Sequence, residues 1–475
     1  MKREKWESDF NSWFNDVLSD AEIMDIRYPV KGLYVWMPYG IKLRNHVIGI
    51  IRQLLENTGH QEVLFPLLIP RDVFEKEAEH IKGFEDEVYW VTKGGTSKLN
   101  VDLALRPTSE TSIYPMLKLW IRSHTDLPLK VYQVVNIFRH ETKATKPLIR
   151  LREVTTFKEA HTAHESEEDA EEQIKKAVEI YKEFFDELGV SYVITKRPAW
   201  DTFAGAKYSI AFDMLAPNGR TLQIGTVHNL GQGFSKVFDL TYETPDGDQE
   251  HIYQTCYGIS DRVIASVLIA HGDDRGPCLP PNVAPIQVVI VPVPFKEEKV
   301  DVNKEAEKVQ DELEDAGIRA KVDDRDLRPG DKYYRWERRG VPVRIEIGPQ
   351  ELKEEKITIV RRDTGEKLSK PRGSLIEDTN EIFKEIKNDL KERAKSYLED
   401  KIEWAEDLEK ARDIIENKQG IARVSWCGQK DCGQKIEDET GGDILGPEFE
   451  GETKTGKCIV CGKKTKTPAI VARTY

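Results

Sequence analysis

The sequence predicts an α+β protein of three domains, at residues 1–285, 286–400 and 401–475. In the first part, runs of β-branched and aromatic residues, two of them joined by a charged loop as an antiparallel pair, alternate with helical segments. A proline-rich linker, residues 279–285, precedes a βαβα alternation, and two pairs of cysteines follow near the C-terminus. A chain of 475 residues is also too long for one ordinary core.

The composition fits a soluble globular protein, with 33% charged and 39% hydrophobic residues. No apolar run approaches the roughly 18 residues of a membrane span, and the first residues lack the apolar core of a signal peptide. We therefore expect a cytoplasmic protein with no membrane partner. The net charge of −13 argues against indiscriminate binding to nucleic acid, so an RNA partner would have to meet local basic patches.

The first elements are helical. Residues 6–18 have apolar side chains at helical spacing, and a second helix is expected over residues 41–57. Residues 63–70 predict a strand that contains Pro66. Because proline cannot donate to a ladder, this strand belongs at a sheet edge or at a special contact. From these residues alone, a plain edge strand is the simpler interpretation.

A loop at residues 105–111 precedes a helix that runs to Arg122. Thr108 or Ser109 could cap this helix, and Glu110 is favoured in its first turn by the helix dipole. Capping alone is a sufficient explanation of these residues. Whether they also contact a substrate stays open at this point.

Residues 131–138 predict a buried strand that ends at Arg139, His140 and Glu141. The chain returns through residues 155–164, after a loop that contains Lys143, Lys146, Arg150 and Arg152. Such an antiparallel pair would form a cradle for an anion, to which the planar guanidinium of Arg139 is suited. An ordinary hairpin with a solvated basic tip is the alternative.

An acidic helix over residues 165–189 is followed by strands over residues 190–195, 208–215 and 222–229. Alternation along the last strand would place Gln223, Thr226 or His228 at a cleft. An isolated histidine is more often a satisfied core or surface residue, which is the alternative for His228.

Arg262 opens a long apolar helix over residues 263–270. A cation in the first turn of a helix is disfavoured by the helix dipole. We therefore expect a compensating anion at this position.

The second domain contains a basic cluster with interleaved aromatic residues. Guanidinium groups can meet phosphates while aromatic faces stack on splayed bases, so the cluster suits single-stranded RNA. Some of these aromatic residues must instead form the buried side of their helix. The cluster comprises Arg325, Arg328, Lys332, Tyr333, Tyr334, Arg335, Trp336, Arg338, Arg339 and Arg344.

The third domain follows a charged segment, residues 374–418, that predicts a solvated helical bridge. Its cysteines have the spacing C-x4-C and C-x2-C, which is typical of a tetrahedral zinc site with no position open for water. Disulfides are the alternative, but a cytoplasmic chain seldom keeps them. The expected ligands are Cys427, Cys432, Cys458 and Cys461, whereas Cys256 and Cys278 are separate from this set and are expected to bind no metal.

Taken together, these motifs resemble a known family. Phe138-Arg139-x-Glu141 and Phe157-Lys-Glu-Ala-His-Thr162 resemble motif 2 of class II aminoacyl-tRNA synthetases, in the form found in prolyl-tRNA synthetases. Residues 41–70 resemble motif 1, which forms the dimer interface of class II enzymes, and residues 254–262 resemble motif 3. The short spacing between motifs 2 and 3 leaves no room for an editing insertion, as in the archaeal and eukaryotic type, which Thr474-Tyr475 also resembles.

The resemblance implies a class II catalytic domain with an antiparallel sheet, an α/β anticodon-binding domain and a small C-terminal α/β zinc domain. It implies that Arg139 and Arg262 are catalytic. The proline site would comprise Thr108, Glu110, Arg139, Phe157, Glu159, His161, His228, Gly258 and Ser260. The ATP site would comprise Arg139, Glu141, Arg150, Leu151, Gln223, Thr226 and Arg262. The tRNA-binding residues would be Arg325, Arg328, Tyr334, Arg338 and Arg344.

The implied reaction is activation of L-proline by ATP to prolyl-adenylate, followed by transfer to tRNA(Pro). The implied cofactors are ATP, Mg²⁺ and structural Zn²⁺, and the implied assembly is a homodimer. A pocket small enough for proline would also admit alanine or cysteine with modest discrimination. One position departs from the pattern: Thr155 stands where many class II enzymes have an aromatic residue that stacks on adenine.

Other functions are less consistent with the same residues. A paralogue that only binds amino acid or RNA would usually lose motif arginines, yet Arg139 and Arg262 are present. A threonine-specific relative would bury zinc in its catalytic site, whereas the paired cysteines lie in the tail. An RNA-binding zinc protein would not need the first half of the chain.

Overall fold

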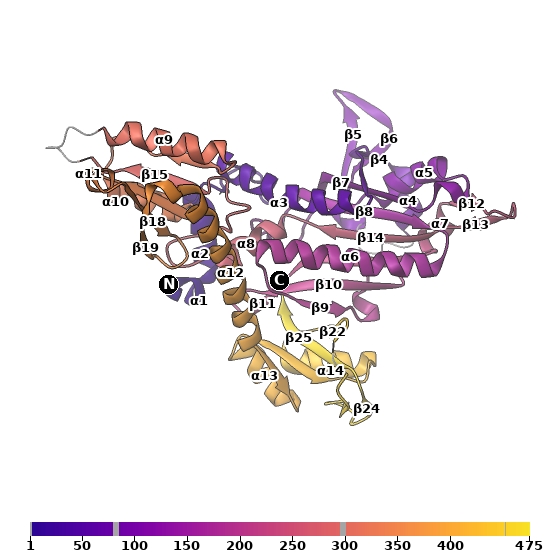
Figure 1. The fold of residues 1–475 in the computed structure, drawn as a ribbon. Helices are drawn as coiled ribbons and strands as arrows, with labels where there is room; N and C mark the ends of the chain where they lie inside the picture. Colours follow the sequence, from indigo (N-terminus) through magenta and orange to yellow (C-terminus); the bar gives the residue numbers. More distant parts are fainter. Residues whose placement is uncertain (1, 79–84, 295–300, 452) are drawn as a thin grey trace.

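The structure, a computed structural model, describes residues 2–78, 85–294, 301–451 and 453–475. Figure 1 shows a large sheet lined by α3 and α6, a compact α/β unit at one end, and a smaller unit that contains the C-terminus. The long helix α12 (Leu375–Asp400) runs from the α/β unit to the smaller one. No described helix has the length and apolar content that crossing a membrane requires.

The large sheet has the strand order β20-β21-β25-β11-β14-β8-β7-β3, with β9, β10 and β22 attached to it. The pairings among β7, β8, β14, β11, β10 and β9 are antiparallel, as predicted for the first domain. The strands of this part are β3 (Gln61–Glu62), β7 (Leu129–Phe138), β8 (Glu153–His164), β9 (Val193–Lys196), β10 (Tyr208–Leu215), β11 (Arg220–Gly231) and β14 (Tyr253–Ile259).

Three helices pack on one face of this sheet: α3 (Pro38–Asn57), α6 (Glu167–Leu188) and α8 (Arg262–His271). The helix α6 begins at a Ser166 cap and ends at Gly189, whose φ of 64° lies in the left-handed region that glycine tolerates. On β11, Val227 belongs to the core on this side, while the neighbouring Thr226 and His228 line a cavity.

The N-terminal segment differs from the single helix that periodicity predicted. It forms α1 (Glu4–Ser8) and α2 (Phe10–Asp20), separated at Asp9. Asp9 has a non-helical backbone, and its carboxylate accepts a hydrogen bond from Ser12 N at 3.4 Å. Aspartate favours this capping role over a helix interior, which periodicity alone does not detect.

The strand predicted over residues 63–70 is shorter than expected. Only β4 (Leu68–Pro70) is a strand, and it joins the hairpin β5 (Tyr89–Gly94) and β6 (Ser97–Leu105) in a separate sheet. Before Pro66, the Phe65 N–H donates to the side-chain oxygen of Gln133 at 3.0 Å instead of joining a ladder. Nearby lie the helices α4 (Arg71–Ala78) and α5 (Glu110–Trp120).

The second domain is a mixed sheet of order β16-β15-β17-β18-β19, as the βαβα alternation predicted. The strand β15 is parallel to its two neighbours, and the remaining pairs are antiparallel. Its elements are β15 (Val288–Pro292), α9 (Val302–Asp315), β16 (Ala320–Val322), α10 (Pro329–Arg338), β17 (Val343–Ile347), α11 (Pro349–Lys353), β18 (Lys356–Arg361), β19 (Lys367–Pro371) and the first turns of α12.

The third domain extends the large sheet, because β25 pairs with β11 in parallel. The prediction of a helical bridge over residues 374–418 was wrong in part, since a strand, β20, separates two helices. That strand pairs with β21, and backbone pairing with a distant segment is not visible in local sequence. The elements are β20 (Ile402–Ala405), α13 (Leu408–Glu416), β21 (Ile421–Ser425), α14 (Lys430–Thr440), β22 (Asp443–Pro447), β23 (Gly456–Lys457), β24 (Lys464–Thr465) and β25 (Pro468–Thr474).

Candidate active site

A cavity of about 440 Å³ opens on the large sheet beside the ends of β7, β8, β11 and β14. The walls bring together most of the residues that the sequence assigned to proline and ATP. These are Thr108, Glu110, Arg139, Glu141, Arg150, Leu151, Phe157, Glu159, Gln223, Thr226, His228, Gly258, Ser260 and Arg262. His161 is the exception, because it lies behind the wall.

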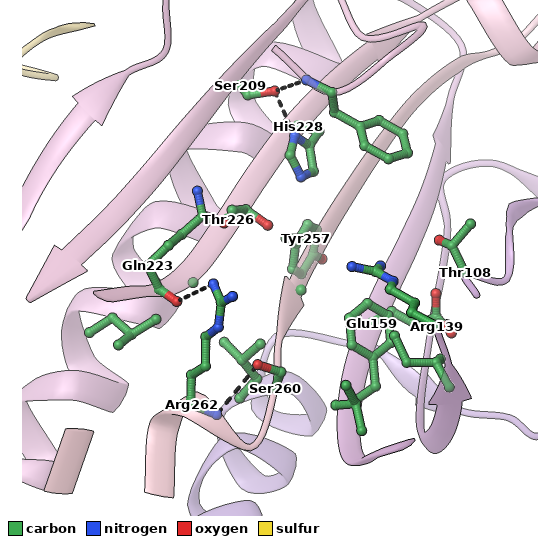
Figure 2. Close-up of a pocket in the computed structure, with 18 of the residues that line it drawn as sticks. Thr108, Arg139, Glu159, Ser209, Gln223, Thr226, His228, Tyr257, Ser260 and Arg262 are labelled. Atoms are coloured by element: carbon green, nitrogen blue, oxygen red, sulfur yellow. Dashed lines mark hydrogen bonds between the residues drawn. The ribbon is translucent and has the colours of Figure 1, made fainter. Parts of the chain in front are cut away.

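Two arginines enter this cavity from different elements, as Figure 2 shows. Arg139 follows β7, and its Nε donates to the Pro107 carbonyl at 3.1 Å. Arg262 is the first residue of α8, and it donates to the carbonyls of Ile149 at 2.9 Å and Gln223 at 3.3 Å. Both side chains are therefore held by carbonyl oxygens and face one space.

The electrostatics of these arginines favour an anionic ligand. Burial lowers the pKa of Arg262 to about 10, and the nearby charges of Arg139 and Arg150 lower it further in the same direction. Burial also lowers the pKa of Arg139. Within the described residues, no carboxylate lies within ion-pair distance of Arg262. An anion that entered the cavity would relieve the repulsion between these cations.

Two buried carboxylates, Glu110 and Glu159, also line the cavity, and Figure 2 shows Glu159 beside Arg139. Glu110 begins α5, is 2% exposed, and accepts a hydrogen bond from the Thr108 hydroxyl. The side chain of Ser109, at the N-cap position, makes no capping hydrogen bond. Capping is therefore not the role of Thr108 and Ser109 here, and Glu110 faces the cavity.

The same burial affects the two carboxyl groups differently. Burial raises the pKa of Glu110. Burial also acts to raise the pKa of Glu159, but bonds from His161 Nε2 at 3.3 Å and Gln133 Nε2 at 2.8 Å bring it below its usual value. His161 is in turn bonded through Nδ1 to the Tyr114 hydroxyl at 3.1 Å. Glu110 and Glu159 together therefore provide at least one buried negative charge to which a cationic group of a ligand can bind.

His228 lies on β11 at the far side of the cavity (Figure 2). Its Nδ1 is 2.7 Å from the Ser209 hydroxyl, and the Phe203 ring lies 5.0 Å from its own ring. Burial lowers the pKa of His228 to about 3, so the imidazole is neutral at physiological pH.

Thr155, which stands where many class II enzymes have an aromatic residue that stacks on adenine, lies outside the cavity. Thr155 does not line the cavity, because its N–H donates to Asp261 at 2.8 Å and its hydroxyl accepts from Trp36 at 2.7 Å. The aromatic Phe157 is on the wall, next to a set of aliphatic residues. That set comprises Ile137, Leu148, Ile149, Leu151, Val154 and Ile224.

Most of the basic cluster in the second domain is occupied by ion pairs. Arg325 pairs with Asp323 at 2.6 Å, Arg338 with Asp20 at 2.7 Å, and Arg344 with both Glu337 and Glu346. Trp336 is buried, as expected for the inner side of this helix. Arg328 and Tyr334 are exposed, and the Arg338 guanidinium lies 4.8 Å from the Tyr334 ring.

The four tail cysteines come together between α14 and the β23–β24 hairpin. Their sulfur atoms lie within 4.8 Å of one another, and the sulfurs of Cys427 and Cys461 are 3.8 Å apart. Four zinc–sulfur bonds of about 2.3 Å in a tetrahedron place sulfurs about 3.8 Å apart, so this cluster fits zinc. Cys256 and Cys278 lie elsewhere, as predicted.

Comparisons with family models place the three parts of the chain in one enzyme family. Residues 89–271 match the tRNA synthetase class II core domain (G, H, P, S and T), and residues 287–382 match an anticodon binding domain. Residues 408–475 match the C-terminal domain of prolyl-tRNA synthetase. The chain belongs to the prolyl-tRNA synthetase family.

Relatives of known name agree with this assignment over the whole chain. A proline–tRNA ligase of Methanothermobacter thermautotrophicus is 55% identical over 97% of this chain and 95% of its own length. One from Sulfurisphaera tokodaii is 52% identical over 100% of both chains. Among solved structures, Giardia lamblia prolyl-tRNA synthetase in complex with prolyl-adenylate has a TM-score of 0.94 and 36% identity, covering 99% of both chains. The Cryptosporidium parvum enzyme complexed with halofuginone and AMPPNP also has a TM-score of 0.94, with 32% identity, covering 99% of this chain and 98% of its own.

Several residues of the cavity wall were not predicted from the sequence. Arg197, Trp200, Asp201 and Phe203 come from the segment between β9 and β10, and Tyr257 comes from β14. Arg197 is anchored by two hydrogen bonds of 2.8 Å to Asp213. Two aromatic residues in a short segment between strands were the only signal, and such a segment has no periodicity to predict its direction.

Proposed function

We propose that the chain uses ATP to convert L-proline to prolyl-adenylate and then transfers the prolyl group to tRNA(Pro). The observation that carries the proposal is one cavity that holds the half-buried Arg139 and Arg262 together with the buried Glu110. A triphosphate and a cationic imino acid are the ligands that match these opposite charges. The Giardia relative, whose structure contains prolyl-adenylate, supports the same assignment.

The first step joins two anions, because the proline carboxylate attacks the α-phosphate of ATP and pyrophosphate leaves. The cavity must therefore supply positive charge where negative charge accumulates. Arg139 would bridge the carboxylate and the α-phosphate, and Arg262 would hold the departing phosphates. Catalysis would consist of positioning and electrostatic stabilisation, with no nucleophilic side chain.

The remaining ATP contacts follow from the walls of the cavity. Glu141, Arg150 and Leu151 lie on the motif 2 side, and Gln223 and Thr226 lie on β11. Mg²⁺ prefers carboxylate and phosphate oxygens, and the carboxylates of Glu141 and Asp201 on this wall fit that preference. Bound with ATP, Mg²⁺ would neutralise phosphate charge.

Proline selection would depend on Glu110, which would pair with the cationic imino group, and on Thr108, which bonds Glu110. Phe157, Glu159, His228, Gly258 and Ser260 would enclose the ring, with His161 supporting Glu159 from behind. Losing one or two methylenes changes binding by only about 1–3 kcal/mol, so alanine and cysteine should also be activated to some degree.

For tRNA, we propose that Arg328 and Tyr334 contribute most of the contact in the second domain, since both are exposed. Arg325, Arg338 and Arg344 would have to leave their carboxylate partners to reach phosphates. We also propose that the four tail cysteines hold a structural Zn²⁺, because no position in that set remains for water. Since aminoacylation serves translation, the proposal places the chain in the cytoplasm.

A homodimer is part of the proposal. The segment around Pro66 and the end of α5 expose several apolar side chains, including Leu64 at 80% exposure. Phe65 and Trp120 pack together with ring centroids 5.6 Å apart, so these two segments form one surface. This surface comprises Leu64, Leu67, Leu68, Met116, Leu119 and Trp120. Apolar surface of this kind is typical of a buried interface.

ATP–pyrophosphate exchange against each amino acid tests the proposed function. We expect exchange with proline, weaker exchange with alanine and cysteine, and a loss of about a hundredfold or more in Arg139→Ala. Exchange that prefers another amino acid would overturn the proposal. Near-normal exchange in Arg139→Ala would remove Arg139 from its role. The chain itself should not hydrolyse alanyl-tRNA.

A further inference from the structure

Three side chains in the cavity region form a set of metal-ligand type. Glu110 comes from α5, His161 from β8 and Cys256 from β14. A carboxylate oxygen, an imidazole nitrogen and the sulfur lie within 4.8 Å of one another. All three residues are buried. The strand register pairs Cys256 directly with His161, so the backbone of the sheet fixes their proximity.

The chemistry of this set suits one divalent ion in particular. Thiolate, imidazole and carboxylate together are ligands that Zn²⁺ accepts in tetrahedral sites with three protein ligands and one open position. Glu110 and Cys256 both line the cavity, so the fourth position would face it. The Tyr114 hydroxyl bonds His161 Nδ1 at 3.1 Å and orients the ring, as outer-sphere partners of metal-binding histidines do.

The charge of the surroundings is also favourable to a cation. With Nδ1 of His161 bonded to Tyr114, Zn²⁺ would bind Nε2 in place of its 3.3 Å bond to Glu159, which leaves a second carboxylate beside the set. Lys158 is adjacent in sequence, but its Nζ bonds the Tyr181 hydroxyl and the Tyr257 carbonyl, on the side of the sheet where α6 packs. Arg139 acts electrostatically on both Glu110 and Glu159, and Arg106 and Lys158 act on Glu159.

We propose that Glu110, His161 and Cys256 bind Zn²⁺ when the imino acid pocket is empty, and that this Zn²⁺ competes with the amino acid substrate. The competition rests on the proposed function, since Glu110 is the residue assigned to the imino group. The metal site itself does not depend on that function. Zinc would thus inhibit the enzyme at a site distinct from the four tail cysteines.

Cobalt binding tests the metal site directly. The purified chain is first saturated at the tail cysteines with one equivalent of Zn²⁺, which Co²⁺ does not displace readily because it binds such sites more weakly. We expect one further equivalent of Co²⁺ to bind with a sulfur-to-cobalt charge-transfer band. Proline should displace this Co²⁺ from the wild-type protein. Absence of the band, or a band that saturating proline leaves unchanged, would overturn the proposal.

Two matched variants identify the cysteine whose sulfur binds the Co²⁺. Cys256→Ser should lose the band, while Cys278→Ser, a change at another buried cysteine that packs against the core of the second domain, should keep it. A band that survives in Cys256→Ser would contradict the assignment. Because the proline displacement uses the wild-type protein, the proposal can be refuted even if Cys256→Ser does not fold.

Kinetics test the competition. Zn²⁺ should raise the apparent KM for proline without lowering kcat, and it should not compete with ATP. Relative to its own rate without added metal, Cys256→Ser should be inhibited at least about tenfold less strongly, since even outer-sphere changes weaken metal binding by that factor. Inhibition that proline cannot overcome would refute the competition. If no exchange with proline occurs at all, the proposed function fails, while the cobalt titration still decides the metal site.

Discussion

Replacing Glu110 with glutamine tests the central electrostatic claim about the proline pocket. The substitution keeps the shape of the side chain and an oxygen that can accept from Thr108, but it removes the negative charge. Glu110 is 2% exposed, so water cannot reach this position to solvate the cationic imino group in place of the carboxylate.

The size of the effect follows from burial. Removing one partner of a buried ion pair costs about 3–5 kcal/mol. Glu159 remains in the same pocket and supplies part of the negative charge, so we expect a cost of about 3 kcal/mol, at the lower end of that range. Since about 1.4 kcal/mol is a factor of ten, kcat/KM for proline should fall about a hundredfold.

The assay combines proline-dependent pyrophosphate exchange with inhibition by tetrahydrofuran-2-carboxylate. That compound has a similar ring and carboxylate but no cation. Glu110→Gln should lose affinity for proline and change little toward the neutral analogue. Glu171→Gln is the control, because Glu171 is a half-buried carboxylate that accepts a hydrogen bond from Asn229 at 2.9 Å outside the cavity.

The pH dependence gives a second readout. Burial raises the pKa of Glu110, so its carboxylate takes up a proton at a higher pH than an exposed glutamate does. Proline binding needs the ionised form, so kcat/KM for proline should fall as the pH decreases through this raised pKa. The variant should lack this decrease. A normal KM for proline in Glu110→Gln, or an equal loss for both ligands, would refute the reasoning.

Three further predictions concern other parts of the chain. Arg262→Met should lower exchange by about 10²–10³-fold and Arg262→Lys by less, since lysine keeps the charge but not the planar donors; unchanged exchange would contradict the phosphate role. Burial lowers the pKa of Lys158 in the folded protein from 10.5 to about 7. Between these two pH values the unfolded chain holds more protons on Lys158 than the folded chain does. The contribution of Lys158 to the free energy of unfolding therefore rises with pH in that window. Lys158→Met should therefore raise the melting temperature more at pH 6 than at pH 9, and equal shifts would argue against a neutral buried amine. Leu64→Asp should dissociate a homodimer in light-scattering measurements, whereas an unchanged mass would place the interface elsewhere.

Sequence reasoning identified most of the cavity because its residues sit at the ends or on one face of strands. Alternation along β11 predicted that Thr226 and His228 share a face, and the structure places both on the cavity wall. The dipole argument predicted that Arg262 needs an anion, and its side chain is held by carbonyl oxygens. These inferences use local periodicity and local charge, which the sequence contains.

What the sequence did not predict depends on contacts between distant segments. Arg338 appeared available for RNA, yet it pairs with Asp20, more than three hundred residues away along the chain. Phe203 reaches the cavity from a segment without regular structure. The strand β20 forms because β21 lies beside it. In each case the deciding partner lies far away along the chain, so local pattern carries no signal for it.

The third domain is joined to the ATP side of the cavity by a shared strand. Its last strand, β25, pairs with the start of β11, which also contains Gln223 and Thr226. A second cavity of about 400 Å³ is lined by Tyr475 and Asp443 from this domain and by Gln223 and Arg262 from the ATP side. Disorder at the tail cysteines would therefore reach the phosphate contacts before it reached the proline contacts on β8, which lies two strands further along the sheet.

This arrangement makes removal of the tail metal a test of how the domains are coupled. With proline present, Cys458→Ser should lose the zinc of the tail cysteines by metal analysis and lower the melting temperature, because four-cysteine zinc sites contribute directly to folding. In pyrophosphate exchange it should raise the KM for ATP more than the KM for proline. An equal rise in both constants would indicate general loosening of the sheet, and unchanged constants would mean that the shared strand holds Gln223 and Arg262 without help from the tail.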